Sequence, residues 1–452
     1  MSARCLAFAL FLLAACSCRP REDFSSLPVP TEAQLRWQQM ELILFCHFGP
    51  NTFSGAEWGD GTEAEDLFNP TDLDCRQWAA TARAAGFKGI IVTAKHHDGF
   101  CLWPNPESTH TVAQSRWREG KGDVLAELSA ACREYGLGFG VYISPWDRHD
   151  PRYGTDAYNE AFTRTLADVH GGRYGTVFEQ WFDGACGEGP DGRQQTYDWD
   201  AFIEVVRRLQ PQAMLFSDVG PDCRWVGSET GFAGETNWST LSPEGFSPGA
   251  GSPPLDTLRQ GNARGTHWIP AEADVSIRPG WFWRASEDTQ LKTVDELMDI
   301  YYGSVGRNAV LLLNVPPDSR GRLPAGDSLR LMEFRERRET VFGKDLAAGI
   351  RQQSRGTEVS LRFPSRQRFN LVCLQENIAE GQRVAAFHVD ILAGGAWKTV
   401  AEGTTIGYKR ILRLPETVSA EGMRICVDRA YGKPRLLPLS LYLDPFKGDC
   451  QK

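Results

Sequence analysis

The stretch Thr176-Val-Phe-Glu-Gln-Trp-Phe-Asp-Gly184 is typical of a β-strand that ends in an acid and a glycine. Aromatic and β-branched residues favour a strand, and because side chains alternate, Glu179, Trp181 and Asp183 share one face. In a closed parallel barrel that face points inward. The glycine leaves room for a ligand beside the backbone, as expected where a strand opens into a functional loop. Asp183 is therefore the first candidate for chemistry, as a nucleophile, a base or a buried structural carboxylate.

Strand-like and helix-like segments alternate on both sides of this stretch. Apolar runs with strand character lie at 42–48, 89–94, 138–144, 176–182, 213–217, 224–227, 273–277 and 308–315. Helical patterns lie at 72–85, 122–135, 156–170, 198–210 and 289–303, with a short one at 32–39 and a last one at 325–342. This order predicts parallel strands and, with eight of them, a (β/α)8 TIM-like barrel over residues 32–342. Residues 228–270 are rich in Gly, Pro and Ser and predict long loops.

The chain changes character after a linker at residues 343–349. Short alternating strands are predicted at 358–363, 369–375, 386–392, 409–414 and 423–427, separated by turn residues,. They indicate a β-sandwich domain at 350–447. Trp397 and Tyr408 could be sugar platforms in this domain, although packing is the commoner use of single aromatic residues.

The N-terminus has the layout of a targeting segment. Arg4 precedes an apolar run at 5–15, which is too short to be a transmembrane span and predicts a signal peptide at 1–16, followed by a tether at 17–31,. Leu13-Ala-Ala-Cys16 is similar to a bacterial lipobox. We therefore expect an exported lipoprotein of the bacterial periplasm or outer membrane, held to the membrane only by a lipid anchor. A simple cleaved signal is the alternative.

The bulk composition narrows the class of ligand. A formal net charge of −9 without a basic cluster argues against nucleic acid as a partner,. The 14 Trp and 24 Phe suit sugar stacking as well as core packing,. The 12 Cys include no CxxC pair and indicate no disulfide framework and no zinc site,. Those within apolar patterns are expected to be small buried hydrophobes, namely Cys46, Cys132, Cys373 and Cys426.

Polar and aromatic residues gather where the first three predicted strands end. His96 and His97 follow the second strand, and His47 lies at the end of the first. Neighbouring histidines on an extended chain point to opposite sides, so hydrogen bonding to sugar hydroxyls is favoured over metal binding. A structural role for one of the pair is the alternative. The other candidates for sugar contacts are Glu57 and Trp58 in the loop after the first strand, and Tyr142 with Trp146 near the end of the third.

Glycoside hydrolysis needs a second carboxyl near Asp183, about 5–5.5 Å away in a retaining enzyme and farther in an inverting one. The candidates are Asp218, Glu229, Glu235 and Glu272. Glu229 ranks first because it follows a predicted strand end with Trp225 nearby, an environment that raises a carboxyl pKa. Glu235 ranks second. Residues that could close the pocket follow the seventh strand: Arg278, Trp281, Phe282 and Trp283.

Four motifs together resemble the family 29 glycoside hydrolases, the retaining α-L-fucosidases. They are HFGPNTFSGAEW (47–58), AKHHDGFCLW (94–103), QWFDGA (180–185) and WVGSE (225–229). The resemblance covers about residues 35–340, and four motifs in order at strand ends are more specific than any one of them. It implies a catalytic barrel followed by a β-sandwich, the latter similar to discoidin-like modules. It also implies Asp183 as nucleophile and a fucose-binding set of His47, Glu57, Trp58, His96, His97, Tyr142 and Trp181, to which we add Trp283.

The resemblance predicts an exo-acting enzyme that releases terminal L-fucose from fucosylated oligosaccharides by double displacement, with Glu229 as acid/base and no cofactor. The WVGSE motif resembles the branch that prefers α-1,3 and α-1,4 linkages, whereas in the other branch the acid lies elsewhere. The alternatives are a barrel glycosidase acting on another hexose and a surface glycan-binding lipoprotein without catalysis. Oligomeric state, disulfide pairing and sugar binding by the C-terminal domain are not determined by these patterns.

Overall fold

The computed structural model describes residues 27–446. The predicted signal peptide and the lipobox cysteine lie outside these residues, as does most of the tether. Within the described part, no helix has the length and apolar character needed to cross a bilayer.

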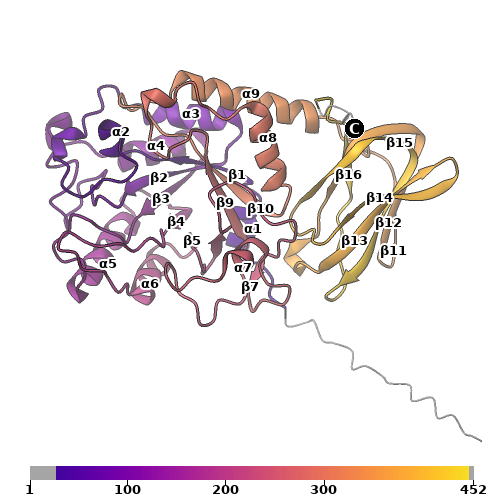
Figure 1. The fold of residues 1–452 in the computed structure, drawn as a ribbon, viewed down its shortest axis with the longest axis horizontal. Helices are drawn as coiled ribbons and strands as arrows, with labels where there is room; N and C mark the ends of the chain where they lie inside the picture. Colours follow the sequence, from indigo (N-terminus) through magenta and orange to yellow (C-terminus); the bar gives the residue numbers. More distant parts are fainter. Residues whose placement is uncertain (1–26, 447–452) are drawn as a thin grey trace, which may run out of the picture.

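Eight parallel strands close into a barrel in the order β1-β10-β9-β6-β5-β4-β3-β2 (Figure 1). Their bounds are β1 Leu42–Cys46, β2 Gly89–Lys95, β3 Gly138–Ile143, β4 Glu179–Trp181, β5 Met214–Ser217, β6 Cys223–Trp225, β9 Ala271–Ser276 and β10 Ala309–Asn314. All eight predicted barrel strands are confirmed, including the two with the weakest sequence patterns. The strand before Asp183 is shorter than predicted, three residues rather than seven, and the segment before it approaches the barrel as a loop.

Helices surround the barrel in the positions that the sequence predicts (Figure 1). The main ones are α1 Glu32–Gln38, α3 Cys75–Ala85, α4 Val124–Tyr135, α5 Asp156–His170, α6 Trp199–Leu209, α8 Val294–Gly303 and α9 Ala325–Phe342, with the short α2 Asn51–Ser54. Local signals fix their ends. The Asp74 side chain caps the start of α3, and Gly86 ends that helix in the left-handed region (φ 90°),.

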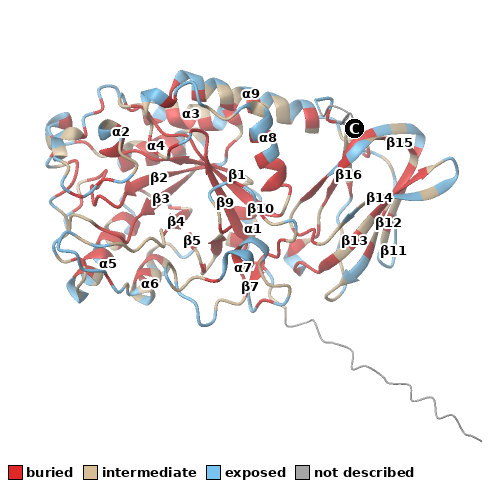
Figure 2. Cartoon of the chain, viewed as in Figure 1, coloured by how far each residue is buried: buried red, intermediate tan, exposed pale blue. Residues whose placement is uncertain are grey.

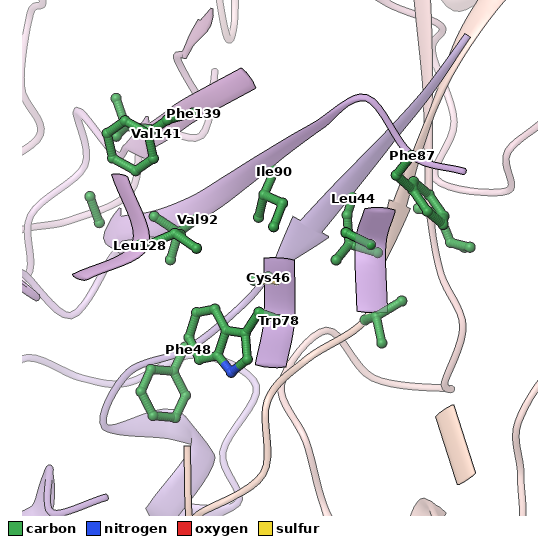
Figure 3. Close-up of a cluster of buried hydrophobic side chains, with 14 of the residues drawn as sticks. Leu44, Cys46, Phe48, Trp78, Phe87, Ile90, Val92, Leu128, Phe139 and Val141 are labelled. Carbon is green, nitrogen blue, oxygen red and sulfur yellow. The ribbon is translucent and has the colours of Figure 1, made fainter. Parts of the chain in front are cut away.

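The outer faces of the barrel strands pack against the helices. Figure 3 shows Leu44, Cys46, Ile90 and Val92 pointing toward Trp78 of α3. Trp78 is fully buried, and its indole N–H donates to the Gly321 carbonyl (3.0 Å). Truncation of such a residue to Ala costs about 3–5 kcal/mol. In Figure 2 the barrel strands are buried, and the helices that surround them are exposed on their outer faces.

The long segment between β6 and β9 is only partly irregular. It contains the short helix α7 Leu255–Gln260 and a two-stranded antiparallel sheet of β7 Thr240–Leu241 and β8 His267–Trp268. The glycine- and proline-rich composition correctly predicted a long connection but gave no sign of this sheet, because two-residue strands leave no periodic pattern.

The C-terminal domain is an antiparallel six-stranded sheet in the order β11-β12-β15-β13-β14, with β16 also paired to β12. The bounds are β11 Gln352–Arg355, β12 Glu358–Leu374, β13 Val384–Ala393, β14 Ala396–Gly403, β15 Arg410–Ala430 and β16 Ser440–Tyr442. Predicted strands 358–363 and 369–375 are one strand, β12, whose pairing with β15 shifts register between them. Buried side chains from both ends of β12 and from both ends of β15 belong to one apolar cluster, so the sheet folds over a single core. Likeness to discoidin modules stays a prediction.

The two domains meet through a buried polar network. The Asn237 side-chain amide donates to the Arg307 carbonyl (2.8 Å), and the Gln382 amide of the C-terminal domain donates to the Asn237 carbonyl (3.0 Å). Arg410 forms an ion pair with Glu235 of the barrel (2.6 Å). Because buried polar groups are costly when unpaired, this network fixes how the domains fit together.

The eight cysteines of the described part are free thiols. Six are buried, including the predicted Cys46, Cys132 and Cys373, whereas Cys426 is only partly covered. Cysteine therefore acts here mainly as a small apolar side chain.

Candidate active site

Asp183 follows the end of β4 at the mouth of the barrel. Its Oδ2 accepts a hydrogen bond from the Tyr142 hydroxyl (2.9 Å), and its Oδ1 accepts one from the Ala185 backbone N–H (2.8 Å). The Nε2 atom of His97 lies 3.8 Å from Oδ2, and 26% of the Asp183 side chain is exposed. The carboxylate is thus held in one orientation while remaining open to a ligand.

Three aromatic rings form a ladder beneath Asp183. Tyr142, Trp181 and Phe216 are aligned neighbours on β3, β4 and β5. Trp181 stacks on Phe216 (centroids 4.0 Å apart) and on Tyr142 (5.3 Å). Since these neighbours lie on opposite sides of Trp181, both faces of the indole are covered. Trp181 therefore forms the floor of the site rather than an open stacking platform.

The three predicted histidines come together at the mouth. His47 and His96 lie 5.8 Å apart and His96 and His97 4.1 Å apart between ring centroids. Burial lowers the pKa of His47 to about 3 and that of His97 to about 4, and lowers the pKa of His96 well below its usual range. All three rings are therefore neutral near pH 7, so each can both donate and accept hydrogen bonds.

Neighbouring side chains set the tautomer of two of these rings. His47 Nδ1 lies 2.9 Å from the Asn314 side-chain oxygen, whose amide N–H2 donates to the Trp281 carbonyl. His97 Nδ1 lies 2.8 Å from the Ser144 hydroxyl, which itself donates to the Trp146 carbonyl. Both Nδ1 atoms must therefore donate, and each Nε2 carries a lone pair.

Glu57 and Trp58 come from the loop after β1. Glu57 Oε1 accepts from the Trp281 backbone N–H (2.7 Å), and its other oxygen pairs with Arg284. Trp58 is 57% exposed and meets His97 edge-on, with the ring centroids 5.7 Å apart. Trp58 is thus the exposed aromatic surface that an apolar part of a sugar can contact.

Glu229 lies in the loop after β6, as its sequence position predicts. Its Oε2 accepts a hydrogen bond from the indole N–H of Trp281 (3.3 Å). Partial burial raises the pKa of Glu229, and the negative charges of Asp183 and Glu57 raise it further, against the opposing effect of Trp281. A carboxyl with a raised pKa near a second, fixed carboxyl matches the arrangement that a general acid and a nucleophile need.

Asp218, at the end of β5, is a further acid beside Asp183. Its Oδ2 accepts from the Gly249 N–H (3.1 Å), and burial together with the Asp183 charge raises its pKa to about 6. A Cβ atom at Gly184 would lie 2.4 Å from Asp218. Gly184 is therefore required by the close approach of this side chain, in addition to any need for ligand space.

Three more carboxyls lie inside the barrel, below the mouth. Glu179 and Glu272 are fully buried and Asp274 is 4% exposed. Glu179 Oε2 accepts from the Trp37 indole (2.8 Å), Glu272 Oε2 from the Trp181 indole (2.9 Å) and Asp274 Oδ1 from the Trp225 indole (2.9 Å). Burial raises the pKa of all three, that of Asp274 to about 8. Glu179 is thus a support inside the barrel, as predicted, and Glu272 is too deep to meet a substrate.

Two other predicted residues lie elsewhere. Glu235, the second-ranked acid, is held by Arg307 and Arg410 at the contact between the domains. The Trp283 indole donates to Asp288 (3.1 Å) and lines a separate hollow with Arg278. Trp281 instead packs on His47, with centroids 5.0 Å apart. Sequence alone could not separate these two tryptophans, since they follow the same strand two residues apart.

Among the described residues, one group has ligand atoms close enough for a metal: His388, Asp390 and Cys426 in the C-terminal sheet. Asp390 already pairs with the Arg424 guanidinium (2.8 Å), and His388 Nδ1 lies 2.8 Å from Asp428. A cation there would have to displace Arg424, so this group does not fit a metal site.

A closed (β/α)8 barrel with two interacting carboxyls at its mouth, ringed by neutral histidines and aromatic side chains, defines the class of barrel glycosidases. The comparisons with known proteins identify the family within that class.

The model of the family Alpha-L-fucosidase matches residues 46–336. The Alpha-L-fucosidase 1 of Arabidopsis thaliana is 41% identical over 93% of this chain and 89% of its own length, and the putative alpha-L-fucosidase 1 of rice is 44% identical over 93% and 86%. A glycoside hydrolase 29 structure from a rumen bacterium has a TM-score of 0.88 with 42% identity, covering 93% of this chain and 78% of that one. The chain belongs to the α-L-fucosidases of glycoside hydrolase family 29, and it is a glycosidase that acts on fucosylated glycans.

The fucosidase assignment sets aside the alternatives of another hexose as substrate and of a non-catalytic glycan-binding protein. The comparisons also correct the predicted location. The two relatives from Arabidopsis and rice, which match over 93% of this chain, are plant fucosidases and not bacterial lipoproteins, so the assignment to a bacterial periplasm or outer membrane is wrong. The predicted location rested on a lipobox-like tetrapeptide, and four residues of common type carry little information about where a protein is located.

Proposed function

We propose that the enzyme releases terminal α-L-fucose with retention of configuration, with Asp183 as nucleophile and Glu229 as acid/base. In the first step Asp183 forms a bond to the anomeric carbon while the glycosidic C–O bond breaks. The proton of Glu229 passes to the departing oxygen. Water then attacks the fucosyl-enzyme, gives a proton to ionised Glu229 and frees Asp183.

The pairing of these two carboxyls carries the proposal. Asp183 is oriented by the Tyr142 hydroxyl and the Ala185 N–H, and its charge acts on Glu229. Double displacement needs one carboxyl that stays ionised and a second that holds its proton. Glu229 has the raised pKa that the second role requires, and Trp281 fixes its Oε2.

The surrounding side chains support recognition of a fucose ring. The Nε2 lone pairs of His47 and His97 can accept from sugar hydroxyls, while Glu57, held by Trp281, accepts another. Exposed Trp58 can contact the C6 methyl group,. A family 29 fucosidase of Ruminococcus gnavus, 32% identical with a TM-score of 0.85 over 96% of this chain and 97% of that chain, was solved in complex with fucose.

Chemical rescue tests the nucleophile. Asp183→Gly should lower hydrolysis of a nitrophenyl fucoside by about 10⁴-fold or more, and added azide should restore turnover and yield β-fucosyl azide. Asp191→Gly, which removes an exposed acid of the following loop, is the matched control and should retain activity. Unchanged turnover in Asp183→Gly, or rescue that yields the α-azide, would refute this assignment.

We further propose a preference for α-1,3- and α-1,4-linked fucose. The support is the WVGSE stretch, which resembles that of the branch with this preference and places Glu229 in the loop after β6. Product analysis on 3- and 4-fucosylated trisaccharides and on 2′-fucosyllactose tests it. Faster release from 2′-fucosyllactose would contradict the preference and leave the fucosidase activity intact.

A further inference from the structure

The C-terminal sheet contains a basic hollow far along the chain from the catalytic residues. It has a volume of about 550 Å³ and is lined by residues of β11, β12, β14 and β15, strands that Figure 1 places in the domain beside the barrel. Its lining includes Arg351, Arg355, Arg362 and Arg424 with the single acid Glu358. Four arginines and one glutamate give +3, in a chain whose net charge is −9.

The sheet register explains why these side chains converge. On β12, Val359 and Leu361 face the core, so Glu358, Ser360 and Arg362 share the outer face,. Arg355 lies opposite Glu358, and Gln353 lies opposite Ser360. The charged residues of adjacent strands therefore stand side by side on one surface.

A glycine beside the hollow allows two strands to approach closely. Gly422 of β15 pairs with Arg362 on one side and with Leu392 of β13 on the other. A Cβ atom there would lie 2.8 Å from the Leu361 carbonyl and 3.1 Å from the Arg362 side chain. Trp397 of β14 pairs with Leu392 of β13 and lines the hollow. Its ring lies 5.2 Å from the Arg362 guanidinium and 4.6 Å from that of Arg424.

The four arginines differ in whether a carboxylate of the protein already pairs with the guanidinium group. Arg424 pairs with Asp390 (2.8 Å) and Glu358 (3.2 Å). Within residues 27–446, the side chains of Arg351, Arg355 and Arg362 have no carboxylate partner within ion-pair distance. Glu358 and Asp390 pair with Arg424, so the charges of the other three arginines are not balanced by an ion pair and favour binding of an anion,. Trp397 reduces the mobility of Arg362 by cation–π contact.

We propose that this hollow binds an acidic sugar, that is, a sugar bearing a carboxylate or a sulfate, on the glycans that the enzyme processes. The planar guanidinium groups match the paired oxygens of either anion. The volume is in the range of small-ligand pockets and exceeds what a bare ion needs. The site would hold an acidic branch of a glycan while the barrel removes fucose from another.

Binding of matched sugars to the full chain tests this, by calorimetry at low ionic strength. 3′-Sialyllactose supplies the carboxylate, 3′-sulfolactose the sulfate, lactose the neutral counterpart and sodium sulfate the bare ion. We expect at least one acidic sugar to bind about 10-fold or more tightly than lactose and than sulfate ion, and more weakly as salt is raised. The sugar that binds identifies the anion.

The double variant Arg355→Gln/Arg362→Gln should weaken that binding about 10-fold or more. Arg368→Gln is the matched control, an exposed arginine on β12 outside the hollow. Hydrolysis of a nitrophenyl fucoside should stay unchanged in all variants, which shows that they are folded. Equal binding of lactose, binding that survives the double variant, or binding only to single-stranded DNA or anionic phospholipid vesicles would overturn the proposal.

Discussion

The acids at the mouth of the barrel and the acids inside it lie on the same strands and following loops, and several share one kind of partner. An indole N–H donates to Glu229 at the mouth and to Glu179, Glu272 and Asp274 inside. The two groups of acids differ in how far their side chains are exposed to solvent. Asp183 keeps 26% of its side chain exposed, whereas Glu179 and Glu272 have none.

This difference indicates that depth, rather than residue type or hydrogen-bond partner, separates the acids proposed to react from those buried inside the barrel. A single indole N–H is a neutral donor and does not offset the loss of water around a carboxylate. The inner acids therefore hold their protons and act as polar packing groups. At the mouth, partial burial and the neighbouring Asp183 raise the pKa of Glu229 while leaving it accessible.

After the loss expected for Asp183→Gly, the largest expected effect is at Glu229. Glu229→Gln should lower kcat/KM about 10³-fold on fucosides with poor leaving groups, because the departing oxygen then receives no proton. Activated substrates such as fucosyl fluoride should be much less affected in the first step. Glu235→Gln is the matched control and should retain near-normal rates, since Glu235 is tied to Arg410. Equal losses in both variants would contradict the assignment.

A substitution at Tyr142 tests how the Asp183 carboxylate is oriented at the mouth of the barrel. Tyr142→Phe removes the hydrogen bond to Asp183 Oδ2 but keeps the stack on Trp181. Loss of a hydrogen bond to a charged group, about 1.5–3 kcal/mol, corresponds to a fall of about 10- to 100-fold in kcat/KM. Tyr302→Phe, which loses a hydroxyl bond to the Asp444 carboxylate away from the barrel mouth, is the control. A fall confined to thermal stability would assign Tyr142 a purely structural role.

A substitution at Asp274 tests whether an acid inside the barrel is protonated in the folded state. Its folded pKa of about 8 lies above its unfolded value, so the unfolded chain releases this proton at lower pH than the folded one. Stability should therefore fall by about 1.4 kcal/mol per pH unit from about pH 4 to pH 8 through this group. Asp274→Asn should remove that part of the slope in denaturant unfolding curves. An unchanged slope would mean that Asp274 is ionised in the fold.

The smallest effect compares two tryptophans. Trp281→Phe removes the indole bond that lowers the pKa of Glu229, so that pKa should rise and the alkaline limb of the kcat/KM profile should move slightly to higher pH,. Trp283→Phe is the matched control and should leave the profile unchanged, because its partner is Asp288. A shift in the second variant alone would reverse their roles.

Much of this site follows from where residues fall relative to strand ends. His47, His96, His97, Tyr142 and Asp183 were expected at the mouth because parallel strands in a closed barrel end on the same side, and the structure brings them together,. Glu229 follows the short β6, which was correctly predicted despite its weak pattern.

Other features depend on contacts between residues distant in the chain. The resemblance placed Trp181 in the fucose-binding set, but only the structure shows that its faces are covered by Tyr142 and Phe216 from adjacent strands. Glu235 looked like an acid/base, but Arg410 of the C-terminal domain binds it. The inner acids could not be recognised as neutral, because burial depends on all the strands at once.

The amino-acid sequence by itself determined the barrel, the trailing β domain and the strand end at which Asp183 lies, because these depend on local periodicity and chain order. The tertiary structure alone decided which acids are shielded from water, which tryptophan reaches Glu229 and how four arginines come to line one hollow of the C-terminal sheet. The physical reason is that solvent exclusion and charge interaction are set by neighbours in space, which local pattern does not encode.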